Sequence, residues 1–587
     1  MSLQMMLLTA SVLGLQFAWG VEMTYVNVYL LSLGMSKTWL SFVWLAGPLS
    51  GLIMQPLIGV LSDKSTSRYG RRRPFMIGGS IIVTIGLIIM AWAKEIASMF
   101  TPVDSPAQSI FAIVLATIAI FVTDFAINSV QACCRALIVD TLPPSRQEIG
   151  NGWAGRMIAI GHLLGYVLGY LDLVGGLHGF LGDTQLKSLC IISSAALLCS
   201  VGITSFAVSE RVLMKSFEHH SLSLFEEMIN IFKVLFQTVR NIPANVTLIF
   251  KIQLCAWYGW FSFLFYSATW AGEIYTKYHS DRQESSDRVG DIARVGSMTM
   301  MIFSIVSLVF SLALPELLEK AAIDTSIRST SAFSTRPSSK VQLGYFVIRR
   351  LITLGRYILR PLQYMRVVLQ NLFDFYEIDI CDFWFASHVV YAVASFSSGF
   401  VRSIGQAGVV VGLCGFSWAV TTWAPFALLA EEILLLNNSQ DGPNDEDGEQ
   451  LQHIEVARPA SPSKINSTAL QSHQHRISNA SEMDFFEEDS ESLGITSDES
   501  GVYLGIHNIA ITAPQFVSSF GSFVIFSIFS DSKEAFSDEG DGGAATAITL
   551  QIGGLTALAA AYFTRKLKAQ RSIHQRFARL PVQEEIY

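Results

Sequence analysis

Residues 108–134 read QSIFAIVLATIAIFVTDFAINSVQACC, and this stretch decides the fold class. Asp124 is its one charged side chain. A helix needs about 20 predominantly apolar residues to cross the hydrocarbon core of a bilayer. In lipid, every backbone N–H and C=O must find a partner, which a helix provides internally and an open strand edge does not. The stretch therefore predicts a membrane-spanning helix that carries one buried acid.

Similar apolar blocks recur along the whole chain of 587 residues. The composition agrees with them, because 51% of the residues are hydrophobic and 15% are charged, whereas soluble proteins carry about 25% charged residues. The blocks predict an all-α polytopic membrane protein that has the lipid bilayer as a partner. The twelve predicted spans lie near 7–32, 39–61, 75–93, 108–134, 153–173, 187–208, 245–271, 295–317, 382–401, 406–430, 501–529 and 545–564.

Lysine and arginine gather in alternate loops of this arrangement. Cytosolic loops of membrane proteins are enriched in these residues. The basic loops fall on the inner side if the N-terminus lies in the cytosol, and an even number of spans then returns the C-terminus to the same side. We expect a multi-pass protein with both termini cytosolic. The expected location is the plasma membrane, with the vacuolar membrane as the alternative.

Two long insertions interrupt the second half of the chain. Residues 318–381 are basic and amphipathic, which favours a helix on the anionic membrane surface; a re-entrant segment is the alternative. Residues 433–500 are acidic and rich in serine, which is typical of a disordered loop. The predicted organisation is an N-terminal bundle (1–210), a central cytosolic linker (211–244), a C-terminal bundle with both insertions (245–564) and a cytosolic tail (565–587).

A polar stripe follows one face of the fourth span. Its members stand at i, i+4, i+7 and i+11 and lie within roughly 60° of one another on a helix. Ionisable groups inside a membrane are costly and mark functional sites. Because desolvation disfavours a charged carboxyl, Asp124 is a candidate proton carrier. Arg135 lies about 16 Å farther along the helix and is a candidate gate or relay. The alternative is polar packing between helices. The stripe consists of Asp124, Asn128, Gln131 and Arg135.

Other spans contribute further candidates. Glu22 is a second intramembrane acid, which either joins proton handling or pairs with Arg156 or another buried base. Asn508 and Gln515 share a face of the eleventh span, and Trp260 lies in an aromatic-rich seventh span. Amides bind sugar hydroxyls, and aromatic rings stack on the apolar faces of sugars. The expected sugar contacts are Asn128, Gln131, Trp260, Asn508 and Gln515.

The loop from Gly59 to Phe75, GVLSDKSTSRYGRRRPF, resembles the signature of the major facilitator superfamily. Its Arg-x-Gly-Arg-Arg-Arg form resembles the sucrose transporter family, which belongs to the glycoside–pentoside–hexuronide cation symporters. Asp63, Arg71 and Arg72 can form state-dependent ion pairs there, so they are a candidate conformational latch. TDFAINSVQACCRALIVD and GIHNIAITAPQFVSS are similar to further segments of that family. The resemblance implies that Asp124 is the proton site and that Arg135 assists it.

Departures from the plant pattern indicate a fungal-type branch. The seventh span ends in Ala268-Thr269-Trp270-Ala271-Gly272-Glu273, where plant members carry Thr-Asp-Trp-x-Gly-Arg. The resemblance implies two six-helix bundles around a midplane cavity that opens alternately to either side. It also implies import of an α-glucoside disaccharide, sucrose or maltose, together with a proton.

Two other functions remain open: a sugar uniporter of the same fold and a transporter-like sugar sensor. An enzyme is not expected, because the sequence holds no nucleophile–base or metal-ligand constellation. No P-loop is present, so we expect the proton gradient rather than ATP or a bound cofactor to drive transport. No nucleic-acid partner is expected.

Overall fold

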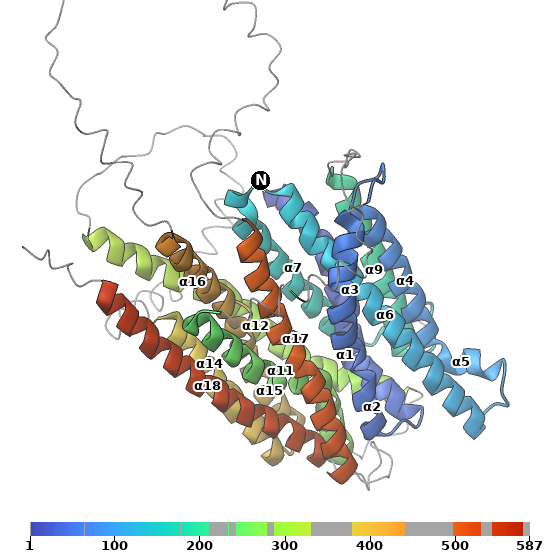
Figure 1. Cartoon of the computed structure of the whole chain (residues 1–587). Helices are drawn as coiled ribbons and strands as arrows, with labels where there is room; N and C mark the ends of the chain where they lie inside the picture. The colour runs from blue at the N-terminus through green and yellow to red at the C-terminus, as the bar shows by residue number, and fades with distance from the viewer. Residues whose placement is uncertain are drawn as a thin grey trace, which may run out of the picture.

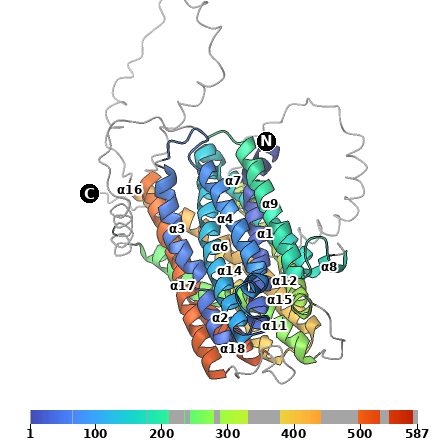
Figure 2. The same ribbon diagram turned by 90° about the vertical axis from the view of Figure 1, so that its right-hand side faces the viewer.

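The computed structural model describes residues 2–63, 65–176, 179–210, 233, 242–278, 287–329, 379–440, 497–529 and 543–578. All regular secondary structure within these ranges is helical, which confirms the predicted all-α class (Figures 1 and 2). The first half holds α1 (Ser2–Ser32), α2 (Lys37–Val43), α3 (Ala46–Asp63), α4 (Arg73–Ala91), α5 (Ala93–Ser98), α6 (Pro106–Thr141), α7 (Pro144–Tyr170), α8 (Leu173–Gly176) and α9 (Gln185–Ala207). The second half holds α11 (Ala244–Tyr278), α12 (Arg288–Ser329), α14 (Ile380–Ser397), the 3-10 turn η1 (Ser398–Phe400), α15 (Ile404–Thr421), α16 (Ala424–Gln440), α17 (Ser497–Phe529) and α18 (Ala544–Ala578).

Eleven helical segments of the described residues are long and apolar enough to cross a membrane. The predicted fifth span corresponds to α7, which has 27 residues but includes Arg146, Arg156 and His162 and is therefore less apolar. It nevertheless packs between the spanning helices α1 and α12. The chain is an integral multi-pass membrane protein.

The helices form two groups. In the first bundle, α1 packs on α7 and α9, while α6 packs on α3 and α4. In the second bundle, α11 and α14 pack on α18, and α12 packs on α15. Figure 1 shows the first bundle in blue to green and the second in green to red. The division follows two hydrophobic cores, one around Leu15, Val83 and Val130 and the other around Trp260 and Tyr391.

Local sequence sets where the helices begin. The hydroxyl of Ser105 accepts a hydrogen bond from the backbone N–H of Gln108, and Pro106 occupies the first turn of α6. Asp379 and Asp382 form a reciprocal capping box at the start of α14. These caps satisfy backbone groups that the first turn of a helix leaves unpaired.

The helix ends mark two opposite faces of the molecule. We call the face with the start of α1 and the loop between α3 and α4 the N-terminal end. The opposite face, which holds α2 and α5, is the α2 end (Figures 1 and 2). The helix α6 begins at the α2 end and finishes at the N-terminal end, so a position along α6 is also a depth in the protein.

Helix α18 continues through Ala578, well past the predicted limit of 564. Its extension is held by ion pairs from Lys568 to Asp382 (2.5 Å) and from Arg571 to Glu431 (2.6 Å). The predicted insertions 318–381 and 433–500 enter the description only where α12, α14, α16 and α17 reach into them. The surface helix and the disordered loop expected there, and nearly all of the linker 211–244, lie outside the described residues.

Candidate functional site

Four polar side chains form a continuous hydrogen-bonded chain across the boundary between the bundles. Asn508 Nδ2 on α17 donates to Gln55 Oε1 on α3 over 2.9 Å. Gln55 Nε2 donates in turn to Asn128 Oδ1 on α6 over 3.2 Å. Asn128 Nδ2 donates to Ser50 Oγ (2.8 Å) and to the backbone carbonyl of Asp124 (3.1 Å). The structure thus brings together Asn128 and Asn508, and it adds Gln55 between them. We call Ser50, Gln55, Asn128 and Asn508 the amide chain.

Glycines on α3 let these amides approach its backbone. A Cβ added to Gly47 would lie 2.7 Å from Gln515 Nε2, and one added to Gly51 would lie 3.5 Å from Asn128 Oδ1. Gly47, Gly51 and Gln55 stand at i, i+4 and i+8, so they occupy one helix face. That face of α3 meets α6 on one side and α17 on the other, which places the predicted residue Gln515 beside the same helix as the amide chain.

Two buried acids lie beside this chain within the first bundle. Asp124 is 3% exposed, and one of its carboxylate oxygens has no hydrogen-bond partner among the described residues. Glu22 is 1% exposed, and both of its oxygens lack a described partner. Glu22 lies on α1 and Asp124 on α6, and these two helices pack on each other. Arg156, a candidate partner for Glu22, is exposed and lies over the Trp153 ring instead, 5.0 Å from its centroid. Buried acids without a cation are costly and indicate a function.

Exposure rises along the α6 stripe from Asp124 toward the N-terminal end. Asp124 is buried, Asn128 and Gln131 are half-buried, and Arg135 is exposed. Arg135 forms no ion pair with any residue that the structure describes, and so it is not a static partner of Asp124. The exposure of this helix face therefore increases from the middle of α6 toward the N-terminal end.

Trp260 occupies a different place from the other predicted sugar contacts. It is buried in the second bundle, with its ring centroid 4.7 Å from Tyr391 and 4.9 Å from Trp418. No hydrogen bond joins this aromatic cluster to the amide chain among the described residues. The structure therefore gathers Asn128, Asn508 and Gln515 around α3 but leaves Trp260 in an apolar core.

The bundles meet tightly at the α2 end. Lys37 Nζ lies 2.7 Å from Glu273 Oε1, and the two side chains are 5% and 0% exposed. Asn27 Nδ2 donates to the backbone carbonyl of Phe265, and Trp44 Nε1 donates to Asn27 Oδ1 over 2.8 Å. The rings of Trp44 and Phe265 stack with centroids 4.4 Å apart. We call these five residues, Asn27, Lys37, Trp44, Phe265 and Glu273, the α2-end cluster.

Further contacts between the bundles lie near the α2-end cluster and join α7 to α12 and α2 to α17. Arg294 on α12 lies 3.4 Å from Asp172, which follows α7. A Cβ added to Gly169 would lie 2.6 Å from Ser297 Oγ, so α7 and α12 approach closely there. Phe42 meets Phe523 of α17 edge to face. The boundary between the bundles is consequently closed at the α2 end.

The N-terminal end has a different pattern. Arg71 and Arg72 lie 3.2 Å and 3.0 Å from Asp140, at the end of α6. Their backbone N–H groups donate to Glu210 Oε2 over 2.6 Å and 2.8 Å. Every ion pair between described residues at this end stays within one bundle. The side chain of Asp63, the third predicted latch residue, lies outside the described residues.

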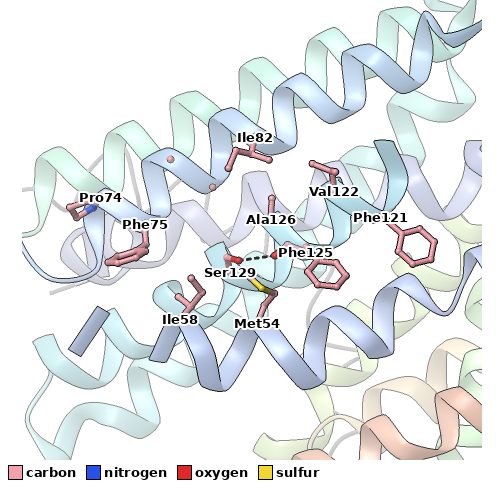
Figure 3. A pocket seen from close by; sticks show the side chains of 12 residues that line it. Met54, Ile58, Pro74, Phe75, Ile82, Phe121, Val122, Phe125, Ala126 and Ser129 are labelled. Carbon is pink, nitrogen blue, oxygen red and sulfur yellow. Dashed lines mark hydrogen bonds between the residues drawn. The ribbon is translucent and has the colours of Figure 1, made fainter. Parts of the chain in front are cut away.

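An apolar groove lies elsewhere, between α3, α4 and α6 (Figure 3). Met54, Ile58 and Phe125 are among its apolar lining. Its one hydroxyl, that of Ser129, already donates to the backbone carbonyl of Phe125 over 2.7 Å. A sugar needs several polar partners, which this groove lacks. Ile82 and Val122 on its rim are exposed, which is typical of a surface that faces lipid tails.

Sequence reasoning missed Gln55, Lys37 and the pairing of Glu273. A signal for Gln55 was present, since it continues the glycine face of α3. Lys37 and Glu273 stand near the ends of predicted spans, where charges are ordinary, so nothing local marks them as partners. Their pairing follows from tertiary packing, in which α2 lies against α17 and its Lys37 reaches Glu273 of α11, and sequence periodicity does not describe such contacts.

An all-α membrane chain of two helix bundles, with polar groups where the bundles meet, defines a secondary transporter of the major facilitator fold. Residues 8–149 match the family described as MFS/sugar transport protein. The chain is 33% identical to the general alpha-glucoside permease of Schizosaccharomyces pombe, over 96% of this chain and 93% of that protein. The chain therefore belongs to the sucrose and α-glucoside transporters of the glycoside–pentoside–hexuronide family, in their fungal-type branch. It is a membrane transporter and not an enzyme.

Two further comparisons agree with this assignment. The chain is 31% identical to the sucrose transport protein SUC4 of Arabidopsis thaliana, over 45% of this chain and 53% of that protein. The crystal structure of a mutant of the nucleoside transporter NupG superposes with a TM-score of 0.52 at 11% identity, over 96% of this chain and 99% of that chain. At that identity the structural likeness supports the fold alone.

Proposed function

We propose that this sugar transporter imports an α-glucoside disaccharide, maltose or sucrose, together with a proton. The fission yeast relative is a general alpha-glucoside permease, and the plant relatives are sucrose transport proteins, which supports this substrate class. In this proposal the N-terminal end faces the cytosol, because the basic loop with Arg71 and Arg72 lies there. The transporter acts in the plasma membrane, with a cytosolic linker (211–244) between bundles 1–210 and 245–564.

One observation carries the proposal: two buried acids without a described cation lie beside the amide chain that joins the bundles. A carboxyl group in such a place changes its charge when water reaches it from a new side. The same region offers amide donors and acceptors for sugar hydroxyls. Proton and sugar sites so close together can be coupled through one conformational change.

The transport cycle follows from the closed α2 end. Asp124 takes a proton, and the amides of Asn128, Gln131, Asn508 and Gln515 bind sugar while the α2 end is open. The bundles then rock into the observed arrangement, in which the exposed stripe of α6 leads to the N-terminal end. Asp124 releases its proton there with help from Arg135, and Glu22 shares the proton. Trp260 supports the sugar site from the aromatic cluster. Asp63, Arg71 and Arg72 latch the N-terminal end when it closes.

Uptake of radiolabelled maltose and sucrose tests this function in cells that lack their own carriers. We expect uptake at acidic external pH to exceed uptake at neutral pH, and Asp124→Asn to abolish accumulation against a gradient. Asn245→Ala is a control outside the proposed site, because that part-buried amide donates to Glu432 within the second bundle.

Two outcomes would contradict the proposal. Uptake that is independent of external pH and is retained in Asp124→Asn identifies a uniporter. Sugar-dependent signalling without uptake identifies a sensor.

A further inference from the structure

We propose that Gln55 is a sugar-binding residue which exchanges its bonds to both bundles for bonds to sugar hydroxyls. This inference rests on the proposed sugar transport and extends it to a residue on α3.

Gln55 is the one member of the amide chain that bonds to both bundles. Its Oε1 accepts from Asn508 of the second bundle, and its Nε2 donates to Asn128 of the first. Its side chain is half-buried. The side chain thus lies between residues that come from different bundles.

The chemistry of the amide suits exchange with a sugar. A hydroxyl group donates one hydrogen bond and accepts others. A sugar hydroxyl placed between Gln55 and Asn508 can donate to the Oε1 of the glutamine and accept from the Nδ2 of the asparagine. No polar group is then left unpaired, which avoids the cost of a buried unsatisfied donor or acceptor. The amide chain is therefore satisfied both with and without sugar.

The position of Gln55 also links binding to movement. Asn508 moves with α17 and Gln55 moves with α3, so rocking of the bundles must stretch or break the bond between their side chains. A sugar that bridges the two amides keeps them connected in another geometry. The hydrogen bonds of Gln55 therefore differ according to whether sugar is bound.

The competing interpretation is that Gln55 only fastens the bundles together. A fastener alters the equilibrium between conformations and therefore changes the maximal rate, with or without a change in KM. A sugar contact raises KM and leaves the maximal rate nearly unchanged. Counterflow exchange of labelled maltose in proteoliposomes separates the two, because it measures sugar binding and exchange without a proton gradient.

Gln55→Ala should raise the counterflow KM about tenfold, the value of one hydrogen bond of about 1.4 kcal/mol, and should leave the maximal rate within about twofold. Gln551→Ala is the matched control: this half-buried amide donates to the Phe396 carbonyl within the second bundle, and its removal should leave KM unchanged. The double variant Gln55→Ala, Asn508→Ala should raise KM by less than the product of the single effects, because both amides bind one hydroxyl.

The outcomes distinguish failure of the proposed role of Gln55 from failure of the proposed sugar transport. A wild-type protein that exchanges maltose, combined with an unchanged KM in Gln55→Ala, overturns the role of Gln55 and leaves the transport proposal intact. A changed maximal rate with unchanged KM shows a fastener and also overturns it. A wild-type protein that exchanges neither maltose nor sucrose overturns both proposals.

Discussion

The two ends of the molecule hold their charges in opposite ways. At the α2 end, the ion pair of Lys37 and Glu273 joins the first bundle to the second and is almost fully buried. At the N-terminal end, the described ion pairs of Arg71 and Arg72 stay inside the first bundle. They share the partly exposed Asp140, and Arg71 is itself partly exposed whereas Arg72 is buried. The difference shows which end is closed in this structure. It also shows what the opposite state requires, since opening the α2 end must separate a buried lysine from its carboxylate.

The energies of the two ends differ accordingly. Removing one partner of a buried pair leaves an uncompensated charge and costs about 3–5 kcal/mol. Partly exposed pairs are typically worth about 0–1 kcal/mol. Substitutions in the α2-end cluster should therefore shift the balance between conformations more than substitutions at the N-terminal end do.

The largest effect is expected from reversing one charge in the α2-end cluster. Lys37→Glu places two acids against each other in a buried contact, so the closed α2 end is disfavoured. We expect the maximal uptake rate to fall by at least about tenfold, because a shift of only 1.4 kcal/mol already changes a population tenfold. Initial rates of labelled maltose uptake, normalised to surface protein, measure this.

The exchanged pair is the control for that prediction. Lys37→Glu combined with Glu273→Lys restores opposite charges and should recover much of the rate. If the double variant has a maximal uptake rate as low as that of Lys37→Glu alone, the ion pair has no role in transport. The effect of Lys37→Glu would then depend on which side chain stands at each position.

A second prediction compares the ends directly through a cysteine reporter. Ser297 is fully buried where α12 meets α7, so a cysteine there is reached only when the α2 end opens. With exposed Cys199 replaced by serine, Lys37→Ala should speed labelling of Ser297→Cys by a water-soluble maleimide about tenfold. If Arg72 latches the N-terminal end as proposed, Arg72→Ala should slow the labelling or leave it unchanged, because loss of that latch favours the observed state.

Labelling at an exposed position supplies the reference. Ser572 lies exposed near the end of α18, and Ser572→Cys should react at one rate in every background. If Lys37→Ala and Arg72→Ala accelerate labelling at position 297 equally, contacts at the two ends do not stabilise opposite conformations of the transporter.

The fold was largely predictable from the sequence, because the hydrocarbon core of a bilayer imposes a length and an apolar composition on each spanning helix. Apolar length marks each span, and Asp124 stands out because an acid is rare in such a block. The all-α class and the family were confirmed. The low apolar content of α7 shows the limit of that signal: its place between α1 and α12 comes from packing in the protein interior rather than from contact with lipid.

The site was predictable only in part. Asn128, Asn508 and Gln515 could be found because each is a polar side chain in an apolar span, and the structure places them around α3. Gln55 connects Asn128 and Asn508 through tertiary contacts, and the periodicity of a single helix does not predict such contacts. Trp260 shows the opposite problem, since an aromatic side chain fits a sugar face and a protein core equally well.

The smallest effect compares two glycines of α3. Gly47→Ala would place a Cβ 2.7 Å from Gln515 Nε2 and must displace that amide, whereas Gly51→Ala places one at an ordinary 3.5 Å from Asn128 Oδ1. If Gln515 binds sugar, Gly47→Ala should raise the counterflow KM about threefold to tenfold, within the worth of one hydrogen bond. Gly51→Ala should stay within about twofold. Equal KM values in the two variants would remove Gln515 from the sugar site.

Sugar-driven proton movement in proteoliposomes reveals whether the carboxyl group of Asp124 couples the proton to the sugar. A pH-sensitive dye inside the vesicles reports protons that enter when maltose is added outside, while counterflow in the same preparation reports sugar exchange. We expect the wild-type protein to move both protons and sugar, and we expect Asp124→Asn to retain sugar exchange but to move no protons. Undiminished proton entry in Asp124→Asn would show that the carboxyl group at position 124 does not couple the proton to the sugar.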